Sequence, residues 1–361
     1  MKLSIKTTKL QEMLSKAIKG ASNNKMIPIT QMMKLELKNG TFTVVTTDAT
    51  NYLYIREKNI EGEDFYVTVE VDTFSKLIAR MNCETVTLEL KNNSLEVVGN
   101  GTYHIALPLD ENGALIKYPE PLLDLEGLSN LGTIKKDTVN TILNTVKPAL
   151  AVTLEIPCYT GYYIGDRVVG TDTFKIASLN EKLFDTPKLL SPEIVNLLNV
   201  VTDEEINVLS KDNTIVFNTT NCIVYGKVMT DIADYQIDAI NGLLDSSFTS
   251  YCKVTKDALL QLLDRLSLFV GAYDKNGVYL TFTENGLQVS SKASSGIELI
   301  PYETSENFKS FTCCIDIEML KSQVSAQTSN VVTIYYGEPN AIKMVDDKIT
   351  QVIALLEDSR A

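Results

Sequence analysis

Few residues of this chain could support catalysis. His104 is the only histidine among 361 residues, and it lies in an alternating segment typical of a strand. This argues against a Ser-His-Asp triad or a metal site built on histidines. No Gly-x-x-x-x-Gly-Lys-Ser/Thr motif is present to cradle a nucleotide phosphate. We therefore expect neither an enzyme nor a bound cofactor.

The cysteines show no metal-binding or disulfide pattern. No Cys-x-x-Cys pair occurs, and the spacing is irregular, which favours reduced, buried thiols over zinc or disulfides. The six cysteines are Cys83, Cys158, Cys222, Cys252, Cys313 and Cys314.

Two Thr-Asp pairs, Thr47-Asp48 and Thr171-Asp172, remain as candidates for carboxylate chemistry. They recur at equivalent positions of an internal repeat, each at the end of a predicted strand. A role in stabilising a turn is therefore favoured over acid-base catalysis. A carboxylate hydrolase stays as an alternative, and it would require a cluster of acids in one cleft.

The elements that position these residues follow a threefold repeat with a period of about 120 residues. Each copy divides into two halves, and each half contains an amphipathic helix, a strand, a polar turn and a second strand. The predicted helices are 8–19, 72–81, 136–146, 192–200, 256–266 and 316–324.

The polar turns predict a β-hairpin in every half. Asn39-Gly40 is the strongest signal, because both residues accept the positive φ of a tight turn. The other predicted turns are Asn92-Asn93, Gly165-Asp166, Asp212-Asn213, Asn285-Gly286 and Glu338-Pro339-Asn340. The paired strands are 33–37 with 41–45, 86–90 with 95–98, 162–164 with 168–169, 206–209 with 215–217, 278–282 with 287–289, and 331–335 with 342–345.

Composition agrees with an α+β protein of several cores. Hydrophobic residues make up 44% of the chain, and no apolar run approaches the ~20 residues that span a bilayer. The cytoplasm is the expected compartment. The repeat, with breakers at Tyr118–Pro121 and Asn241-Gly242, predicts domains at 1–122, 123–246 and 247–361.

Over essentially its whole length the chain resembles the bacterial sliding clamp, the β subunit of DNA polymerase III. The segments that carry this resemblance are Met26-Ile27-Pro28-Ile29, Thr47-Asp48, Pro157-Cys158-Tyr159-Thr160-Gly161, Thr171 to Ala177, Asp234-Tyr235 and the apolar C-terminal strand Gln351 to Leu356. The resemblance implies three tandem clamp domains, each with two helices packed on antiparallel sheets.

The resemblance also implies a function without catalysis. Two chains would join head to tail in a ring that encircles duplex DNA, with helices lining the hole and contacts to phosphate independent of sequence. The implied partners are a DNA polymerase catalytic subunit and a clamp loader, both bound through short linear motifs. No membrane association is expected. A clamp-like scaffold that has lost DNA encirclement is the alternative.

Charge distribution bears on DNA binding. The net charge is −13, yet the six helices, counted with their flanking residues, carry 11 Lys or Arg against 8 Asp or Glu. The candidate DNA contacts are Lys16, Lys19, Lys25, Lys76, Arg80, Lys135, Lys136, Lys147, Lys253, Lys256, Arg265, Lys275 and Lys321. The family pattern is absent at Asn24, where an arginine is common, and in the loop 151–155, which has no basic or amide side chain.

The resemblance places a partner-peptide groove between the second and third domains. It is expected to anchor a linear motif through apolar contacts. Its candidate residues are Tyr159, Thr171, Thr173, Phe174, Lys175, Ile176, Ala233, Ile237, Asp238, Val352, Ala354, Leu355 and Leu356. Phe174 replaces a commoner histidine, and Ala354-Leu355-Leu356 replaces a proline- and arginine-containing end, so a different partner preference is expected. A slip of one residue in the last strand would exchange its inward and outward side chains.

The third candidate site is the ring seam, where a first domain would meet a third domain of the other chain. The edge strand 103–107 and the helix before it are expected on one side, and the end of the helix 256–266 on the other. The candidate residues are Phe74, Leu77, Tyr103, Ile105, Leu107, Leu266, Phe269 and Val270.

Overall fold

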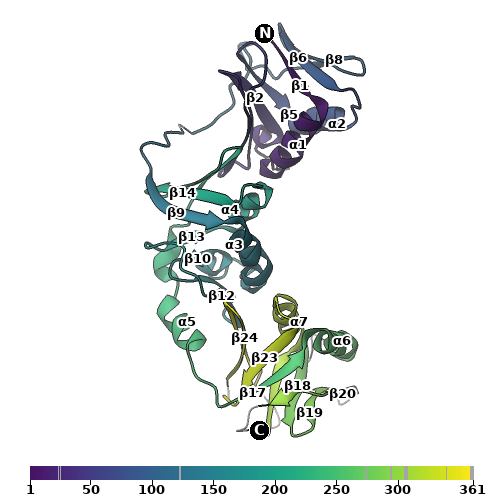
Figure 1. Ribbon diagram of the computed structural model, residues 1–361, viewed down its shortest axis with the longest axis vertical. Coiled ribbons are helices and arrows are strands. Elements are labelled where there is room, and N and C mark those ends of the chain that lie inside the picture. The colour runs from purple at the N-terminus through teal and green to yellow at the C-terminus, as the bar shows by residue number, and fades with distance from the viewer. Residues whose placement is uncertain are drawn as a thin grey trace. The chain divides into compact units, whose positions relative to one another are not determined.

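The computed structural model describes residues 1–361 except 23, 25, 122, 272, 274, 293–294, 305–307, 339 and 358–361. Its contacts divide it into two compact units (Figure 1). Unit 1 contains Met1–Val139 and Glu193–Val228, and unit 2 contains Asn140–Pro192 and Met229–Ala361. None of the described helices is both long and apolar enough to span a bilayer.

All six predicted helices are present within a few residues of their expected bounds. The α-helices among the described residues are α1 (Thr7–Ala17), α2 (Val71–Ala79), α3 (Lys136–Thr141), α4 (Pro192–Leu197), α5 (Ile237–Leu244), α6 (Lys256–Leu266) and α7 (Ile317–Ser325). The interpretation of Asn241-Gly242 as a chain breaker is wrong, because both residues lie inside α5. The helix forms there because Ile240 and Leu244 are one turn apart and both are buried.

Unit 1 contains two antiparallel sheets. The smaller sheet has the order β1-β6-β7-β8, and the larger has the order β5-β2-β3-β4-β16-β15-β14-β9. The bounds are β1 Lys2–Lys6, β2 Met32–Lys38, β3 Thr41–Thr47, β4 Tyr52–Glu57, β5 Phe65–Glu70, β6 Thr85–Lys91, β7 Ser94–Val98, β8 Thr102–Ala106, β9 Ser129–Lys135, β14 Glu205–Lys211, β15 Thr214–Asn218 and β16 Cys222–Lys227. The pairing of β4 with β16 joins strands of the first two predicted domains.

Unit 2 repeats this arrangement. Its large sheet has the order β13-β10-β11-β12-β25-β24-β23-β17-β21, and its small sheet the order β20-β19-β18-β22. The bounds are β10 Tyr162–Ile164, β11 Val168–Thr171, β12 Lys175–Leu179, β13 Lys188–Leu190, β17 Ser250–Thr255, β18 Gly277–Thr283, β19 Gly286–Ser291, β20 Ile297–Ile300, β21 Glu303–Thr304, β22 Phe311–Asp316, β23 Val331–Tyr336, β24 Ala341–Asp346 and β25 Ile349–Ala354. Here β12 pairs with β25, again across predicted domains.

The two units do not follow the three predicted domains, because each large sheet contains strands from two of them. Strands β9 and β14 to β16 lie in unit 1, while β10 to β13 lie in unit 2. The division at 122 and 246 therefore stays a prediction. The antiparallel sheets and their helices match the predicted α+β class.

Among the predicted hairpin turns whose residues are all described, one departs from its sequence signal; Pro339, in the turn predicted at 338–340, lies outside the described residues. Asn39 and Gly40 have φ of 50° and 73°, as a tight turn of mirror-image type requires. The turn predicted at Asn285-Gly286 lies one residue earlier, since Thr283 pairs directly with Gly286. Gly286 has a φ of 143° and lies so close to Ile300 that a side chain would collide with the backbone carbonyl.

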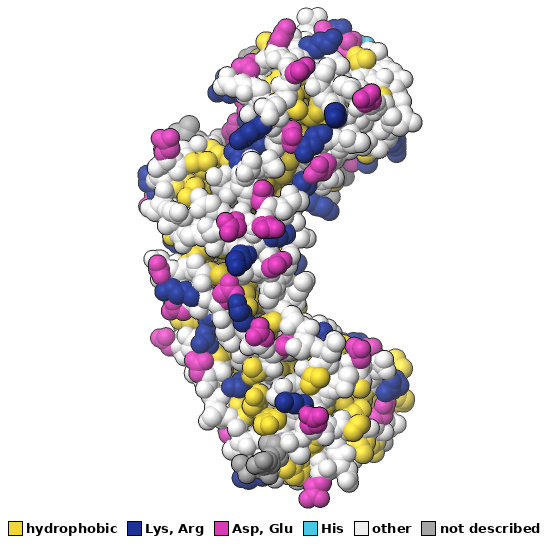
Figure 2. All heavy atoms as spheres, viewed as in Figure 1, with side chains coloured by type: hydrophobic (Ala, Val, Ile, Leu, Met, Phe, Trp, Pro, Cys, Tyr) yellow, Lys and Arg dark blue, Asp and Glu magenta, His cyan; other side chains and the backbone are white. Residues whose placement is uncertain are grey.

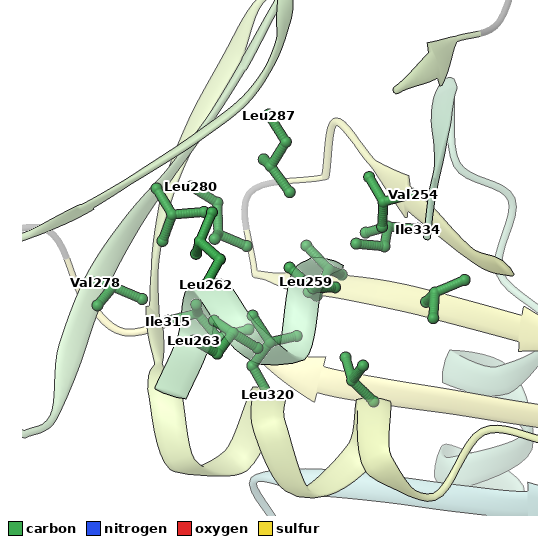
Figure 3. Close-up of a cluster of buried hydrophobic side chains, with 14 of the residues drawn as sticks. Val254, Leu259, Leu262, Leu263, Val278, Leu280, Leu287, Ile315, Leu320 and Ile334 are labelled. Carbon is green, nitrogen blue, oxygen red and sulfur yellow. The ribbon is translucent and has the colours of Figure 1, made fainter. Parts of the chain in front are cut away.

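An apolar core in unit 2 shows how α6 and α7 pack on the sheets (Figure 3). Leu259, Leu262 and Leu263 of α6 are fully buried, and Leu320 of α7 lies beside them. Their spacing of three and four residues is the helical pattern that the sequence analysis used. The strands contribute alternating side chains, such as Val278 and Leu280 of β18.

The cysteines are free, and all are buried except Cys83, which is half-buried. Burial raises the pKa of the Cys222, Cys252 and Cys313 thiols to about 12. The prediction of reduced, buried thiols is confirmed for these residues.

A buried carboxylate fixes the turn that precedes β23. Asp346 Oδ2 accepts hydrogen bonds from the Thr328 amide and hydroxyl, both at 2.7 Å, and from the Ser329 amide at 2.9 Å. Oδ1 accepts from the Ser329 hydroxyl. Burial alone would raise the pKa of Asp346, but these hydrogen bonds outweigh it and lower the pKa.

Because Asp346 has a lower pKa in the folded chain than the unfolded value of about 3.9, its contribution to stability is complete above that pH. The contribution is lost as the pH falls through the folded pKa. We expect Asp346→Asn to lower the free energy of unfolding at pH 7 by ~1.5–3 kcal/mol, because an amide cannot accept all four hydrogen bonds. Urea unfolding between pH 3 and 7 measures this.

The neighbouring Asp347→Asn is the matched control. Asp347 is exposed and has a φ of 44°, which asparagine tolerates, so its replacement should change stability by less than ~0.5 kcal/mol. Equal effects of the two substitutions would show that the Asp346 hydrogen bonds contribute nothing.

Candidate partner and nucleic-acid interfaces

The Thr171-Asp172 pair closes the turn between β11 and β12. The Thr171 hydroxyl donates to the Lys175 carbonyl at 2.8 Å, and Asp172 Oδ1 accepts from the amides of Phe174 at 3.0 Å and Lys175 at 2.9 Å. Thr173 lies between them with a φ of 80°. The turn thereby places the Phe174 side chain outward, where 59% of it is exposed.

The Thr47-Asp48 pair builds an equivalent turn in unit 1. The Thr47 hydroxyl donates to the Asn51 carbonyl at 2.6 Å, and Asp48 Oδ1 accepts from the amides of Thr50 and Asn51. The predicted turn-stabilising role is confirmed for both pairs. Among the described residues no group of three or more His, Cys, Asp or Glu side chains could hold a metal.

An apolar cluster behind the Thr171–Lys175 turn brings most of the predicted peptide residues together. Ile176 of β12 is paired with Val352 of β25, and both are buried against the Tyr159 and Tyr235 rings. Tyr159 and Tyr235 contact edge to face, with ring centroids 5.1 Å apart. The partly buried Ile237 of α5 packs on the same cluster.

Tyr235 is a residue of this cluster that the sequence analysis did not place in the site. Its hydroxyl donates to the Val169 carbonyl at 3.3 Å, and its ring stacks on Tyr163 with centroids 5.3 Å apart. Burial raises its pKa well above the ordinary value. The adjoining cluster members Cys158, Val169, Leu189, Ile240 and Leu244 were also missed. Tyr235 and Cys158 lie in segments that carry the family resemblance, but nothing in the sequence marks the other members, because they approach one another only in the folded chain.

Predicted residues outside the cluster fall into two groups. Ala233 and Asp238 are exposed, and Lys175 forms an ion pair with Asp172 at 3.3 Å. The C-terminal strand ends at Ala354, whose amide donates to the Phe174 carbonyl at 2.8 Å.

The expectation that Leu355 and Leu356 lie on the last strand is wrong. Leu355 is partly buried and packs against the core shown in Figure 3. Leu356 forms an isolated β-bridge with Cys314. The register of β25 is clear from the burial of its side chains. Val352 faces the cluster around Tyr159 and Tyr235, called here the tyrosine cluster, while Ile353 faces the core formed with α6 and α7.

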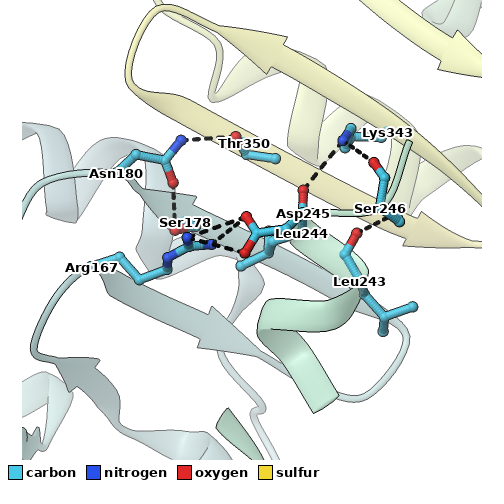
Figure 4. A network of polar contacts seen from close by, with 9 residues as sticks. All are labelled: Arg167, Ser178, Asn180, Leu243, Leu244, Asp245, Ser246, Lys343 and Thr350. Atoms are coloured by element: carbon cyan, nitrogen blue, oxygen red, sulfur yellow. Dashed lines mark hydrogen bonds and ion pairs between the residues drawn. The ribbon is translucent and has the colours of Figure 1, made fainter. Parts of the chain in front are cut away.

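Polar contacts hold α5 beside this cluster (Figure 4). Lys343 Nζ donates to the Leu244 carbonyl at 3.2 Å and to the Ser246 carbonyl at 2.6 Å, so its charge lies at the carboxyl end of the helix. Arg167 pairs with Asp245 at 3.2 Å. On the sheet nearby, Asn180 donates to the Thr350 hydroxyl at 2.9 Å.

Four of the predicted DNA-contacting cations are already paired with acids. The ion pairs are Lys16 with Glu12, Lys76 with Asp72, Arg265 with Glu298 and Lys321 with Asp264, at 2.5 to 2.8 Å. On the face drawn in Figure 2, basic side chains likewise alternate with acidic ones and form no continuous patch. Exposed pairs of this kind contribute little to stability, so a phosphate can replace the acid at small cost.

Lys136 and Lys256 make structural contacts with backbone carbonyls. Lys136 Nζ donates to the carbonyls of Leu198 and Asn199 at 2.9 and 3.0 Å. Lys256 Nζ makes the equivalent contacts with Ser325 and Gln327 at 3.0 and 2.5 Å. Each lysine therefore satisfies carbonyls at the end of the second helix of its repeat. Burial lowers the pKa of Lys136.

The remaining cations differ in their surroundings. Lys19, Arg80, Lys135 and Lys275 are exposed, whereas Lys253 lies over the Tyr251 ring at 6.0 Å. Lys147 is exposed at the end of its helical segment and also interacts with other groups. Lys25 lies outside the described residues.

A cavity of about 780 Å³ in unit 1 contains two of the predicted cations. Lys16 and Lys19 line it from α1 and the turn that follows, and Asn196 and Asn199 line it from α4 and its extension. These side chains donate hydrogen bonds through ammonium and amide groups, the donors that phosphate oxygens accept. Asp48 and Glu193 also line the cavity and limit its positive charge.

The predicted seam residues differ in how much of each side chain is exposed. Phe74 and Leu266 are almost completely buried in their own cores, so the prediction that they contact another chain is wrong. Leu107 is also buried, at 6% exposure, and Leu77, Ile105 and Val270 are partly buried. Tyr103 and Phe269 are exposed, as a seam requires. Sequence analysis missed two exposed side chains of edge strand β20, Ile297 and Leu299.

The capping role of Lys136 generates a test in which the adjacent Lys135 is the control. We expect Lys136→Met to lower the free energy of unfolding by ~1–3 kcal/mol, because the carbonyls at the helix end lose their partner. Lys135→Met, at an exposed position, should change it by less than ~0.5 kcal/mol. Urea unfolding of both variants measures the difference, and equal stabilities would contradict the capping role.

Comparisons with known proteins agree with this geometry. Residues 1–112 match the family model of the DNA polymerase III beta subunit, N-terminal domain. A search of curated proteins found no match. Among solved structures, the beta subunit of Streptococcus pyogenes DNA polymerase matches with a TM-score of 0.87 at 16% identity, covering 99% of this chain and 100% of that one.

Two further structures show the same full-length likeness. The Bacillus subtilis DNA polymerase sliding clamp has a TM-score of 0.84 at 16% identity and 99% coverage of both chains. The Thermotoga maritima DNA polymerase III beta subunit has a TM-score of 0.84 at 15% identity, covering 99% of this chain and all of that one. The whole chain thus has the fold of the bacterial sliding clamps, and its first 112 residues match the N-terminal domain of the DNA polymerase III beta subunit.

Proposed function

We propose that this protein is a non-catalytic DNA sliding clamp. Two chains close a ring around duplex DNA, and the ring tethers a DNA polymerase and a clamp loader through short peptide motifs. The observation that carries the proposal is the pattern of strand pairing between repeats, which leaves one complementary pair of edge strands unused.

The pairing pattern is the same at both places where repeats join. Each repeat contains two helices. At each join, the third strand that follows the first helix of one repeat pairs with the third strand that follows the second helix of the next repeat. These pairs are β4 with β16 and β12 with β25. The remaining strands at these two positions are β20 and β8, and each forms one edge of a four-stranded sheet.

Pairing of β20 with β8 of a second chain would complete the pattern. Two such contacts, related by twofold symmetry, would close the dimer into a ring. Neither β8 nor β20 would then have an open edge. The exposed apolar side chains Ile297, Leu299 and Tyr103 lie on these edges and support a seam there.

The chemistry of DNA binding follows from the cations of the helices. Lys19, Arg80 and Lys135 are exposed, and Lys16 and Lys76 are held by exposed ion pairs that a phosphate can replace. Such contacts attract the DNA backbone without reading its bases, as sliding requires. Because the cations are few, topological closure is expected to hold the protein on DNA more than affinity does.

Retention on DNA tests the ring. We expect the protein, loaded with its cognate loader and ATP, to stay on nicked circular duplex DNA through gel filtration at 0.3 M salt and to slide off after linearisation. Replacing Ile297 and Leu299 with Asp should abolish retention on the circle, because the acids face the partner strand. Leu243→Asp, at a similarly exposed position on α5, is the control.

Two results would contradict this. Equal retention of the intact protein on linear and circular DNA would indicate ordinary affinity binding. Failure of the protein to remain on either form, with partner peptides still bound, would support the scaffold that has lost DNA encirclement.

The tyrosine cluster of unit 2 is proposed as the partner-peptide site. Phe174 lies exposed beside it, on a turn fixed by Asp172 and tied to β25 through the Ala354 amide. A rigid turn presents this ring at little entropic cost, and apolar anchors of a linear motif can pack on it.

We expect Phe174→Ala to weaken binding of a fluorescein-labelled peptide from the C-terminus of the same organism's polymerase catalytic subunit about tenfold, since loss of an aromatic anchor typically costs more than ~1 kcal/mol. Fluorescence anisotropy measures the affinity. Met26→Ala, which removes an exposed apolar side chain from unit 1, should leave the affinity unchanged. If the Phe174 variant bound the peptide with unchanged affinity, the peptide site would have to lie elsewhere on the protein.

A further inference from the structure

The partner-peptide cluster of unit 2 has a structural counterpart in unit 1. Both large sheets contain a row of paired residues that begins at the threonine of a Thr-Asp turn. In unit 2 the row is Thr171, Ile176, Val352, Lys343 and Tyr335. In unit 1 it is Thr47, Tyr52, Tyr225, Val216 and Leu209.

The chain segment that follows each repeat covers the same face of its sheet. In unit 2 this segment is α5, which packs Ile240 and Leu244 on the row. In unit 1 Leu125 and Leu128 pack there, on a segment that has no helix. Tyr118 of unit 1 corresponds to Tyr235 of unit 2, and prolines at 119 and 121 follow it. These prolines explain the absence of a helix, because they remove amide donors and restrict the residue before them.

The two rows differ at the position of Lys343, which lies beneath the covering segment of unit 2. In unit 2 Lys343 extends from the sheet, and its ammonium group binds the carbonyls at the end of α5 (Figure 4). The corresponding residue in unit 1 is Val216, which is too short to reach across. A cavity of about 210 Å³ is present there, bordered by Val216, Tyr225, Leu125 and Leu128.

The charges around this cavity are suited to a cation. The carboxylates of Asp124 and Asp212 line it, and Lys211 is the cation that borders it. Asp124 accepts a hydrogen bond from the Gly127 amide at 3.3 Å through one oxygen, and both acids are exposed at the rim. The net charge of these three side chains is negative, which disfavours a nucleic-acid phosphate.

We propose that this cavity is a second peptide site, which takes a lysine or arginine side chain flanked by apolar residues from a partner protein. The cationic side chain enters this cavity from solvent. Its aliphatic stem lies on Tyr225, its charge meets Asp124 and Asp212, and the flanking apolar residues contact Leu125 and Leu128. The site does not depend on the proposed clamp function.

The test uses the full-length protein with methyl-labelled Leu and Val and the probe acetyl-Leu-Arg-Leu-amide. We expect methyl resonances of Val216, Leu125 and Leu128 to shift on titration. The isosteric citrulline peptide, which lacks the charge, should bind about fivefold more weakly and shift these resonances less at the same concentration. The double variant Asp124→Asn and Asp212→Asn should bind the arginine probe about fivefold more weakly, because two neutral amides replace the acids.

Both substitutions preserve the backbone. Asparagine can accept the Gly127 hydrogen bond at position 124, and it tolerates the φ of 52° at position 212. Equal shifts with the citrulline peptide, unchanged affinity of the double variant, or shifts confined to Val352 near the first site would each overturn the proposal. Because no DNA is involved, these outcomes are independent of whether the protein encircles DNA.

Discussion

Antiparallel pairing between strands of successive repeats is the interaction on which the rest of this structure depends. A single hairpin half cannot bury both its helix and its sheet edges, so each must find a neighbour. The backbone hydrogen bonds of β4 with β16 and of β12 with β25 supply two such neighbours within the chain. The same geometry leaves β8 and β20 with open edges. The proposed dimer is thus a consequence of how the repeats join.

The functional surfaces arise where the repeats differ from one another. Both Thr-Asp turns use the same hydrogen bonds, but only the turn in unit 2 presents an exposed aromatic ring, Phe174. Similarly, Lys343 binds the end of α5 in unit 2, whereas Val216 occupies the corresponding position in unit 1 and a cavity adjoins it. Lys136 and Lys256 show the opposite case, because the same capping contact recurs at two repeats and marks a structural requirement. Repetition therefore identifies structural residues, and departures from it identify candidate sites.

Sequence periodicity was sufficient to predict the six repeat helices and most of the hairpins, because both depend on local spacing of apolar and turn residues. It failed at α5, where Asn241-Gly242 suggested a break but tertiary burial of Ile240 and Leu244 favours a helix. The composition of the tyrosine cluster also depends on long-range pairing, so the sequence drew attention to Asp234-Tyr235 without showing that Tyr235 belongs to the cluster. Charge counting cannot distinguish a capping lysine such as Lys136 from an exposed one such as Lys135.

The claim that β8 and β20 complete the pairing pattern between two chains is tested most directly by the mass of the intact protein in solution. Sedimentation equilibrium at micromolar concentration should give twice the 40.0 kDa of one chain, with no larger assembly, because the two open edges satisfy each other in a closed dimer. A mass of 40.0 kDa at the same concentration would show that the edges remain unpaired and would contradict the account.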